Sequence, residues 1–273
     1  MRIKILGTAA AEGWPALFCN CQACVEALKL KGKNIRTRSS IQIDEILKID
    51  FPPDSLYHAL RYQLTFADLS FLLITHAHFD HLATEQLSYL IPPFALQDQT
   101  KTLKVFGTAE VIERIKTLKN WDESLRPSLL NILKPFQSLR LDPYVIETVE
   151  AVHGTEGQSL NYLISRDQKR FLYASDTGFY KEKTWNYLRG KYVDLVIAEC
   201  TGGPQNLTYG SHMGFPNIQK FRTKAESIGL TNDDTIWVIT HFSHTGGMLH
   251  EDLRELTAPF GYEVAWDGME IQL

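Results

Sequence analysis

A run of metal-binding side chains directly after a buried segment constrains this chain more than any other feature. The segment Leu69–Ile74 is mainly apolar and predicts a buried strand. The next seven residues contain four candidate metal ligands: His76, His78, Asp80 and His81. Because side chains alternate along a strand, we expect His76 and His78 to point the same way, with Asp80 and His81 turning back toward them. Imidazole and carboxylate donors are typical of zinc, manganese or iron sites.

The alternative for such a cluster is a group of surface histidines without a role, and a lone histidine is more often structural. Four donors in one turn exceed what a single metal takes from so short a segment. The spacing therefore predicts a pair of metals that is completed by ligands from later in the chain.

Three further candidate ligands follow directly on predicted strands. They are His153 after Tyr144–Val152, Asp176 near the end of Arg170–Ala174, and His241 after Thr235–Thr240. Each taken alone is as readily structural, but polar groups at several strand ends gather at one rim of a sheet. The predicted sites are His76, His78 and His153 for one metal, and Asp80, His81 and His241 for the other. Asp176 is the predicted bridge, because a carboxylate has two oxygens.

A second cluster of donors lies near the N-terminus, where Cys19, Cys21 and Cys24 fall within six positions. Three thiolates do not complete a tetrahedral zinc, so a fourth ligand is needed. His244 stands three residues after His241 and is the candidate. We therefore predict a structural zinc, against the alternatives of three free thiols or a redox-active pair. Cys200 is predicted to be an ordinary small buried residue.

His212 lies in the loop Ser211–Gly214, after a predicted strand that ends near Glu199. In such a loop it is placed to act on a leaving group. The alternative is a loop histidine in water.

The overall composition indicates one soluble domain over residues 1–273, with 44% hydrophobic residues and a net charge of −4. That charge gives no basic field for extended nucleic acid. No apolar run is long enough for a membrane span, and no signal peptide is evident, so we expect a cytoplasmic protein. Strands arranged in hairpins before helices predict an α+β sandwich of two sheets flanked by helices. The segment Trp121–Ser138 is open to three interpretations, of which core is favoured over a cover for the site or a homodimer interface.

These motifs, in this order, resemble the metallo-β-lactamase superfamily, which implies a four-layer αββα sandwich with a dinuclear site. The cysteine cluster, His212 and the N-terminal segment Gly7–Gly13 resemble its PhnP-type phosphodiesterases, relatives of tRNase Z. That resemblance implies that His212 is the general acid and that Cys19, Cys21, Cys24 and His244 hold the structural zinc. One departure is Asp50–Asp54, which stands where the family usually has an Asp-x-Gly turn.

The resemblance implies hydrolysis of a small cyclic phosphate or nucleotide-type phosphodiester by a hydroxide that bridges two divalent metals, with Asp80 orienting the water. The metals are zinc or manganese, or iron, besides the structural zinc. No long basic arm for tRNA is present. Hydrolysis of a carboxylic ester, lactone or thioester at the same site is the alternative, and a non-catalytic accessory protein, such as one in cofactor biosynthesis, is a third interpretation.

Overall fold

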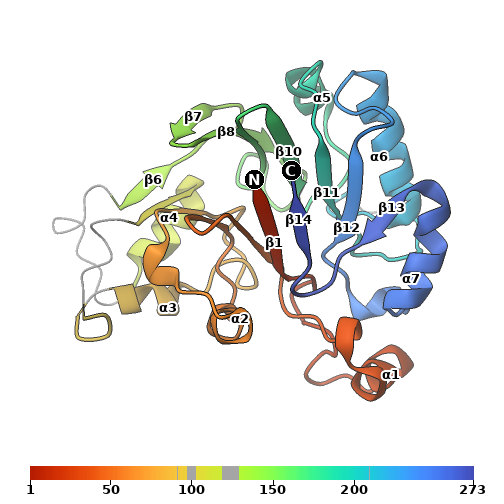
Figure 1. Cartoon of the computed structure of the whole chain (residues 1–273), viewed down its shortest axis with the longest axis horizontal. Coiled ribbons are helices and arrows are strands. Elements are labelled where there is room, and N and C mark those ends of the chain that lie inside the picture. The colour runs from red at the N-terminus through yellow and green to blue at the C-terminus, as the bar shows by residue number, and fades with distance from the viewer. Residues whose placement is uncertain (91, 97–102, 119–128, 209) are drawn as a thin grey trace.

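The structure is a computed structural model that describes residues 1–90, 92–96, 103–118, 129–208 and 210–273. In this part of the chain two sheets pack face to face, and helices cover their outer faces (Figure 1). The predicted four-layer αββα sandwich is therefore confirmed.

The first sheet has seven described strands in the order β14-β1-β2-β3-β4-β5-β6. Their bounds are β1 Arg2–Gly7, β2 Ser40–Ile43, β3 Leu47–Ile49, β4 Phe71–Leu73, β5 Lys104–Gly107, β6 Leu130–Ile132 and β14 Glu270–Gln272. Strands β3, β4, β5 and β6 run parallel, whereas β14, β1, β2 and β3 are antiparallel. The last and the first strand of the chain are thus neighbours.

The second sheet has seven described strands in the order β13-β12-β11-β10-β9-β8-β7. Their bounds are β7 Ser138–Leu141, β8 Tyr144–Glu150, β9 Leu160–Arg166, β10 Lys169–Ala174, β11 Leu195–Glu199, β12 Ile236–Thr240 and β13 Tyr262–Val264. Strands β10 to β13 are parallel, so their carboxyl ends meet at one edge of the sheet.

The helices flank the sheets on their outer sides (Figure 1). Their bounds are α1 Gln22–Leu30, α2 Ser55–Tyr62, α3 Thr84–Leu87, α4 Ala109–Lys116, α5 Glu182–Leu188, α6 Phe215–Ser227 and α7 His250–Thr257. Thr108 caps helix α4, and its hydroxyl accepts a hydrogen bond from the Val111 N–H. No helix among the described residues is long and apolar enough to cross a membrane.

Three apolar clusters fill the layers. One lies between the sheets, one lies between the second sheet and α5 to α7, and one lies under α3 and α4. The period of two along the strands sets this division: on β3, Leu47 and Ile49 face the inter-sheet core, and Lys48 between them points to the other face.

Most predicted elements are present, with two exceptions. Strands β6 and β7 were not anticipated, and the predicted strand Leu69–Ile74 shrinks to β4, Phe71–Leu73. Of the segment Trp121–Ser138, residues 121–128 lie outside the described residues. In its described part Leu129 and Leu133 are buried, as a core segment predicts, whereas Ile132 is half-exposed.

Candidate metal centres

Two sets of parallel strands bring the candidate ligands to one place. In the second sheet, Ala174 pairs with Ala198 and Glu199 pairs with Thr240, so Asp176, Glu199 and His241 leave the sheet at the same edge. In the first sheet β3 and β4 are also parallel, so the segments that follow them leave together. The chain therefore delivers its polar strand ends to a single rim.

The histidine motif itself is not an extension of a strand. Strand β4 ends at Leu73, and residues 75–81 run through bends and turns. The prediction that alternation along a strand orients the side chains of His76 and His78 is therefore wrong. The N–H groups of His81 and Leu82 both bond to the carbonyl of His78, at 3.1 and 2.9 Å, and this turn folds the motif back on itself.

The first donor group consists of His76, His78 and His153, whose ligand atoms lie within 4.8 Å of one another. Nε2 of His76 is 2.9 Å from Nδ1 of His78, and Nε2 of His153 is 3.1 Å from the same atom. Burial, followed by the charge of His81, holds the pKa of His76 well below its usual value, and burial also lowers the pKa of His153. Both rings are thereby kept in the neutral form that binds metals.

The second donor group consists of Asp80, His81, Asp176 and His241, all buried and again within 4.8 Å. Oδ2 of Asp176 lies 2.8 Å from Nε2 of His81 and 3.3 Å from Nε2 of His76. Its Oδ1 lies 2.8 Å from Nε2 of His241. The carboxylate of Asp176 therefore faces both groups, as the proposed bridge requires.

The chemistry of these atoms fits divalent metals. Nε2 of His81, Nε2 of His241 and Oδ1 of Asp176 are fully buried, and among the described residues their short contacts do not have the geometry of hydrogen bonds. Buried polar atoms are normally satisfied, so such a convergence needs an explanation. Imidazole nitrogens around a shared carboxylate form the donor set of zinc, manganese or iron.

Two of these residues have unusual backbones, and so does a third beside them. Asp176, His241 and Asp50 have φ of 48°, 57° and 63°, in the left-handed region that non-glycine residues rarely adopt. Each follows the end of a strand, where the left-handed turn redirects its side chain toward the rim. Such conformations concentrate at functional sites.

Asp50 belongs to the site as well as to the turn Asp50–Asp54. It is fully buried, and its carboxylate accepts hydrogen bonds from the N–H of Thr75 at 2.8 Å and from Nδ1 of His81 at 2.7 Å. These contacts fix the ring of His81 and leave its Nε2 for a metal. The signal was available, because Asp50 directly follows an apolar strand, as Asp176 nearly does.

Glu199 is a second site residue that the sequence analysis did not predict. It is the last residue of β11 and is fully buried. Its carboxylate accepts hydrogen bonds from the N–H groups of Thr177, Thr201 and Met213, at 2.9, 3.1 and 3.2 Å. The hydroxyl of Thr201 in turn lies 2.9 Å from Nδ1 of His241. Glu199 thus organises the loops behind the second donor group.

His212 lies at the same site and contacts Glu199. Its Nδ1 is 2.9 Å from Oε1 of Glu199, and its ring centroid is 4.8 Å from that of His153. Burial opposes an imidazolium here, but the hydrogen bond to Glu199 and the charge of that carboxylate outweigh it and raise the pKa of His212 to about 9. The structure therefore brings His212 beside both donor groups.

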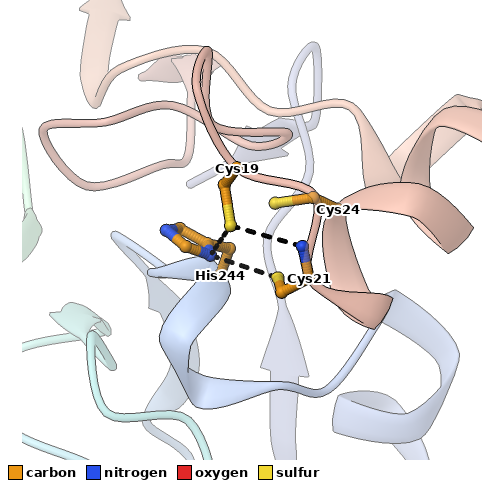
Figure 2. Close-up of side chains that lie close together, drawn as sticks. All are labelled: Cys19, Cys21, Cys24 and His244. Carbon is orange, nitrogen blue, oxygen red and sulfur yellow. Dashed lines mark hydrogen bonds between the residues drawn. The ribbon is translucent and has the colours of Figure 1, made fainter.

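The cysteine cluster is brought together from distant parts of the chain (Figure 2). Nδ1 of His244 lies 3.6 Å from Sγ of Cys19 and 3.5 Å from Sγ of Cys21, and Cys24 completes a group within 4.8 Å. The hydrogen bond to His244 lowers the pKa of the Cys21 thiol to about 6, whereas burial raises that of Cys24 to about 11. Three thiols and one imidazole are a donor set for tetrahedral zinc.

A cavity of about 300 Å³ opens over the His/Asp groups. Its lining residues come from the loops of both sheets: Ala10, Ala11, Glu12, His78, Asp80, His153, Asp176, Thr201, His212, His241, Ser243 and Thr245. It is large enough for a small substrate next to the metal-binding atoms.

Comparisons with known proteins agree with this fold. The Beta-lactamase superfamily domain matches residues 49–248. Coenzyme PQQ synthesis protein B of Acinetobacter baumannii (strain SDF) is 25% identical over 320 aligned positions that cover all of both chains.

Two solved structures extend the comparison. Zn²⁺-bound PqqB from Methylobacterium extorquens superposes with a TM-score of 0.73 at 18% identity over all of both chains. A new diphosphatase from the PhnP family superposes with a TM-score of 0.71 at 21% identity, over 99% of this chain and 97% of that one. At these identities the superpositions speak for the fold alone.

Proposed function

The chain belongs to the beta-lactamase superfamily, whose members are mostly metal-dependent hydrolases, and from that premise we propose that it hydrolyses a phosphodiester in a small substrate such as a cyclic phosphate or a nucleotide. One observation carries the proposal: Asp176 of the second donor group also contacts His76 of the first, and His212, held by Glu199, lines the same cavity of about 300 Å³. Phosphodiester cleavage needs charge stabilisation on the phosphoryl oxygens and a proton for the departing oxygen, and this site offers groups for both.

The metals would be held by His76, His78 and His153 on one side and by Asp80, His81 and His241 on the other, with Asp176 between them. Divalent ions bound there would supply Lewis-acid activation of a water molecule and of a phosphoryl oxygen. Asp80 lines the cavity beside His78, where its carboxylate would orient the attacking water.

His212 is the proposed general acid. Its Nδ1 contacts Glu199, and this contact orients the imidazole ring in the cavity, where it would give a proton to the departing oxygen. Glu199 accepts four hydrogen bonds, three from backbone N–H groups and one from the Thr201 hydroxyl. These bonds fix its carboxylate and thereby the ring of His212. Proton transfer from such a group typically contributes about 10²–10⁴-fold to the rate.

A second candidate rests on the sequence relative. Coenzyme PQQ synthesis protein B aligns with this chain over all of both sequences, which favours a role in coenzyme synthesis on the same site. In that case the substrate is a coenzyme precursor, and simple phosphodiesters are not turned over.

The test combines metal analysis with a leaving-group series on purified protein. We expect about three metals per chain, with one lost in Cys21→Ser and at least one active-site metal lost in His81→Ala. Bis-p-nitrophenyl phosphate is expected to be hydrolysed in preference to p-nitrophenyl acetate and simple lactones. His212→Ala should slow esters with poor leaving groups most, while Ser211→Ala, which keeps the loop backbone, serves as the matched control.

Two outcomes would overturn the assignment. Hydrolysis of p-nitrophenyl acetate or lactones, with no hydrolysis of phosphodiesters, would favour the carboxylic ester, lactone or thioester alternative. An equal loss across all leaving groups in His212→Ala would remove that residue from the acid role.

A further inference from the structure

One carboxylate of the cavity belongs to neither donor group. Glu12 lines the cavity beside His241 and Ser243, yet its oxygens lie outside every metal-donor group among the described residues. No lysine or arginine is present among the residues that line this cavity. Away from the metals, a substrate in the cavity therefore meets Glu12 as the charged group on the N-terminal side.

The backbone that carries Glu12 is fixed from three sides. The N–H of Ala10 bonds to the carbonyl of Phe242 at 3.0 Å, and Nε of Arg38 donates to the carbonyl of Ala11 at 2.8 Å. The N–H of Gly13 closes a turn onto Ala10 at 3.0 Å, with a φ of 71° at the glycine. This loop therefore presents Glu12 at a defined position rather than as a freely moving side chain.

The carboxylate is anchored at one oxygen and free to bind at the other. Oε1 accepts a hydrogen bond from the hydroxyl of Ser243 at 2.5 Å and lies 3.8 Å from Nε2 of His244. Among the described residues no donor bonds to Oε2, and the side chain is 32% exposed. His244 uses its other nitrogen toward the cysteines, so the cysteine cluster supports the wall of the cavity.

We propose, resting on the hydrolase function above, that Glu12 determines substrate specificity. Its carboxylate accepts a hydrogen bond from a donor group, a hydroxyl or an ammonium, carried by the part of the substrate beyond the reacting phosphoryl group. It also excludes substrates with a second anionic group there, because two like charges would face each other at a place that no lysine or arginine lines. A hydrogen bond to a charged group of this kind is worth about 10- to 100-fold in selectivity.

Four p-nitrophenyl phosphodiesters that share one leaving group test this: the propyl, 3-hydroxypropyl, 3-aminopropyl and 2-carboxyethyl esters. For the metal-loaded wild type we expect kcat/KM to be about 10- to 100-fold higher for the donor-bearing esters than for the propyl ester, and lowest for the carboxyethyl ester. Glu12→Gln should remove the preference for the aminopropyl ester over the propyl ester and raise kcat/KM for the carboxyethyl ester relative to the propyl ester. Glu26→Gln is the matched control, since Glu26 has similar exposure and pairs with Lys29 outside the cavity.

A binding measurement separates this inference from the proposed function. Calorimetric titration of the metal-loaded proteins with 3-aminopropyl phosphate and propyl phosphate reports the contact with Glu12 even if no ester is hydrolysed. Selectivity that is equal in the wild type and in Glu12→Gln, by kinetics and by calorimetry, would overturn the role of Glu12 while the phosphodiesterase assignment stood. A uniform loss across the esters together with loss of zinc would assign Glu12 a purely structural role and overturn the proposal as well.

Discussion

The buried lysine of β3 gives a stability prediction that can be worked from the structure. Lys48 has no exposed surface, its Nζ donates to the hydroxyl of Ser40, and it lies 5.3 Å from the ring centroid of Phe66. Burial lowers the pKa of Lys48 from 10.5 to about 7, although the charge of Asp50 opposes the effect. The folded protein therefore holds this amine neutral at a pH where the unfolded chain protonates it.

The sign and the size follow from proton linkage. Between about pH 7 and pH 10.5 the unfolded chain binds the extra proton, so the free energy of unfolding rises with pH by about 1.4 kcal/mol per pH unit from this group. The whole difference amounts to about 5 kcal/mol, fully present as a destabilisation below pH 7. Lys48→Met removes the amine, and the Ser40 hydroxyl keeps its bonds to the carbonyls of Ile49 and Asp50 at 2.9 and 3.0 Å.

Urea unfolding followed by tryptophan fluorescence, at constant ionic strength, measures the effect. We expect Lys48→Met to be more stable than the wild type near pH 7.5, and the advantage to shrink by roughly 2–3 kcal/mol by pH 9.5. Lys29→Met, on the exposed face of α1, is the control and should follow the wild type at each pH. A difference between Lys48→Met and the wild type that stays constant across this range would refute the reasoning.

Two further predictions concern the site. Asp50→Asn should weaken metal binding at the second donor group by about 10- to 100-fold, because the ring of His81 loses its carboxylate partner. Dialysis against increasing concentrations of a chelator, followed by metal analysis, measures the effect. Full retention of the metal would contradict the prediction. Gly178→Ala should lower the proposed phosphodiesterase activity by about 10²-fold while the metals are kept. A Cβ at Gly178 would lie 1.6 Å from the carbonyl oxygen of Gly210, so it must displace the loop that carries His212. Unchanged kinetics at full metal content would contradict this account.

The fold, and the meeting of the ligands at one rim, could be predicted from the sequence, because both depend on patterns along the chain. Apolar strands with His or Asp at their ends are visible without coordinates, and so is the triple cysteine. The orientation of His76 and His78 could not be predicted, because it comes from hydrogen bonds to the carbonyl of His78 rather than from a strand.

The supporting carboxylates, Asp50 and Glu199, could not be predicted as site residues for a different reason. Asp50 and Glu199 bind no predicted metal themselves, and their role depends on contacts with His81 and His212 across 31 and 13 positions. Strands β6 and β7 escaped because their sequences are short and partly polar, so the pairing with β5 and β8 stabilises them rather than their own pattern.

The left-handed backbones of Asp50, Asp176 and His241 also set a direction for the evolution of this chain. Each such residue destabilises the fold by about 1–3 kcal/mol relative to a residue that adopts the conformation freely. A lineage released from selection for chemistry would therefore gain stability by acquiring glycine at any of the three positions. Aspartate or histidine in place of glycine at all three positions is what a site that needs these side chains requires, at the expense of stability.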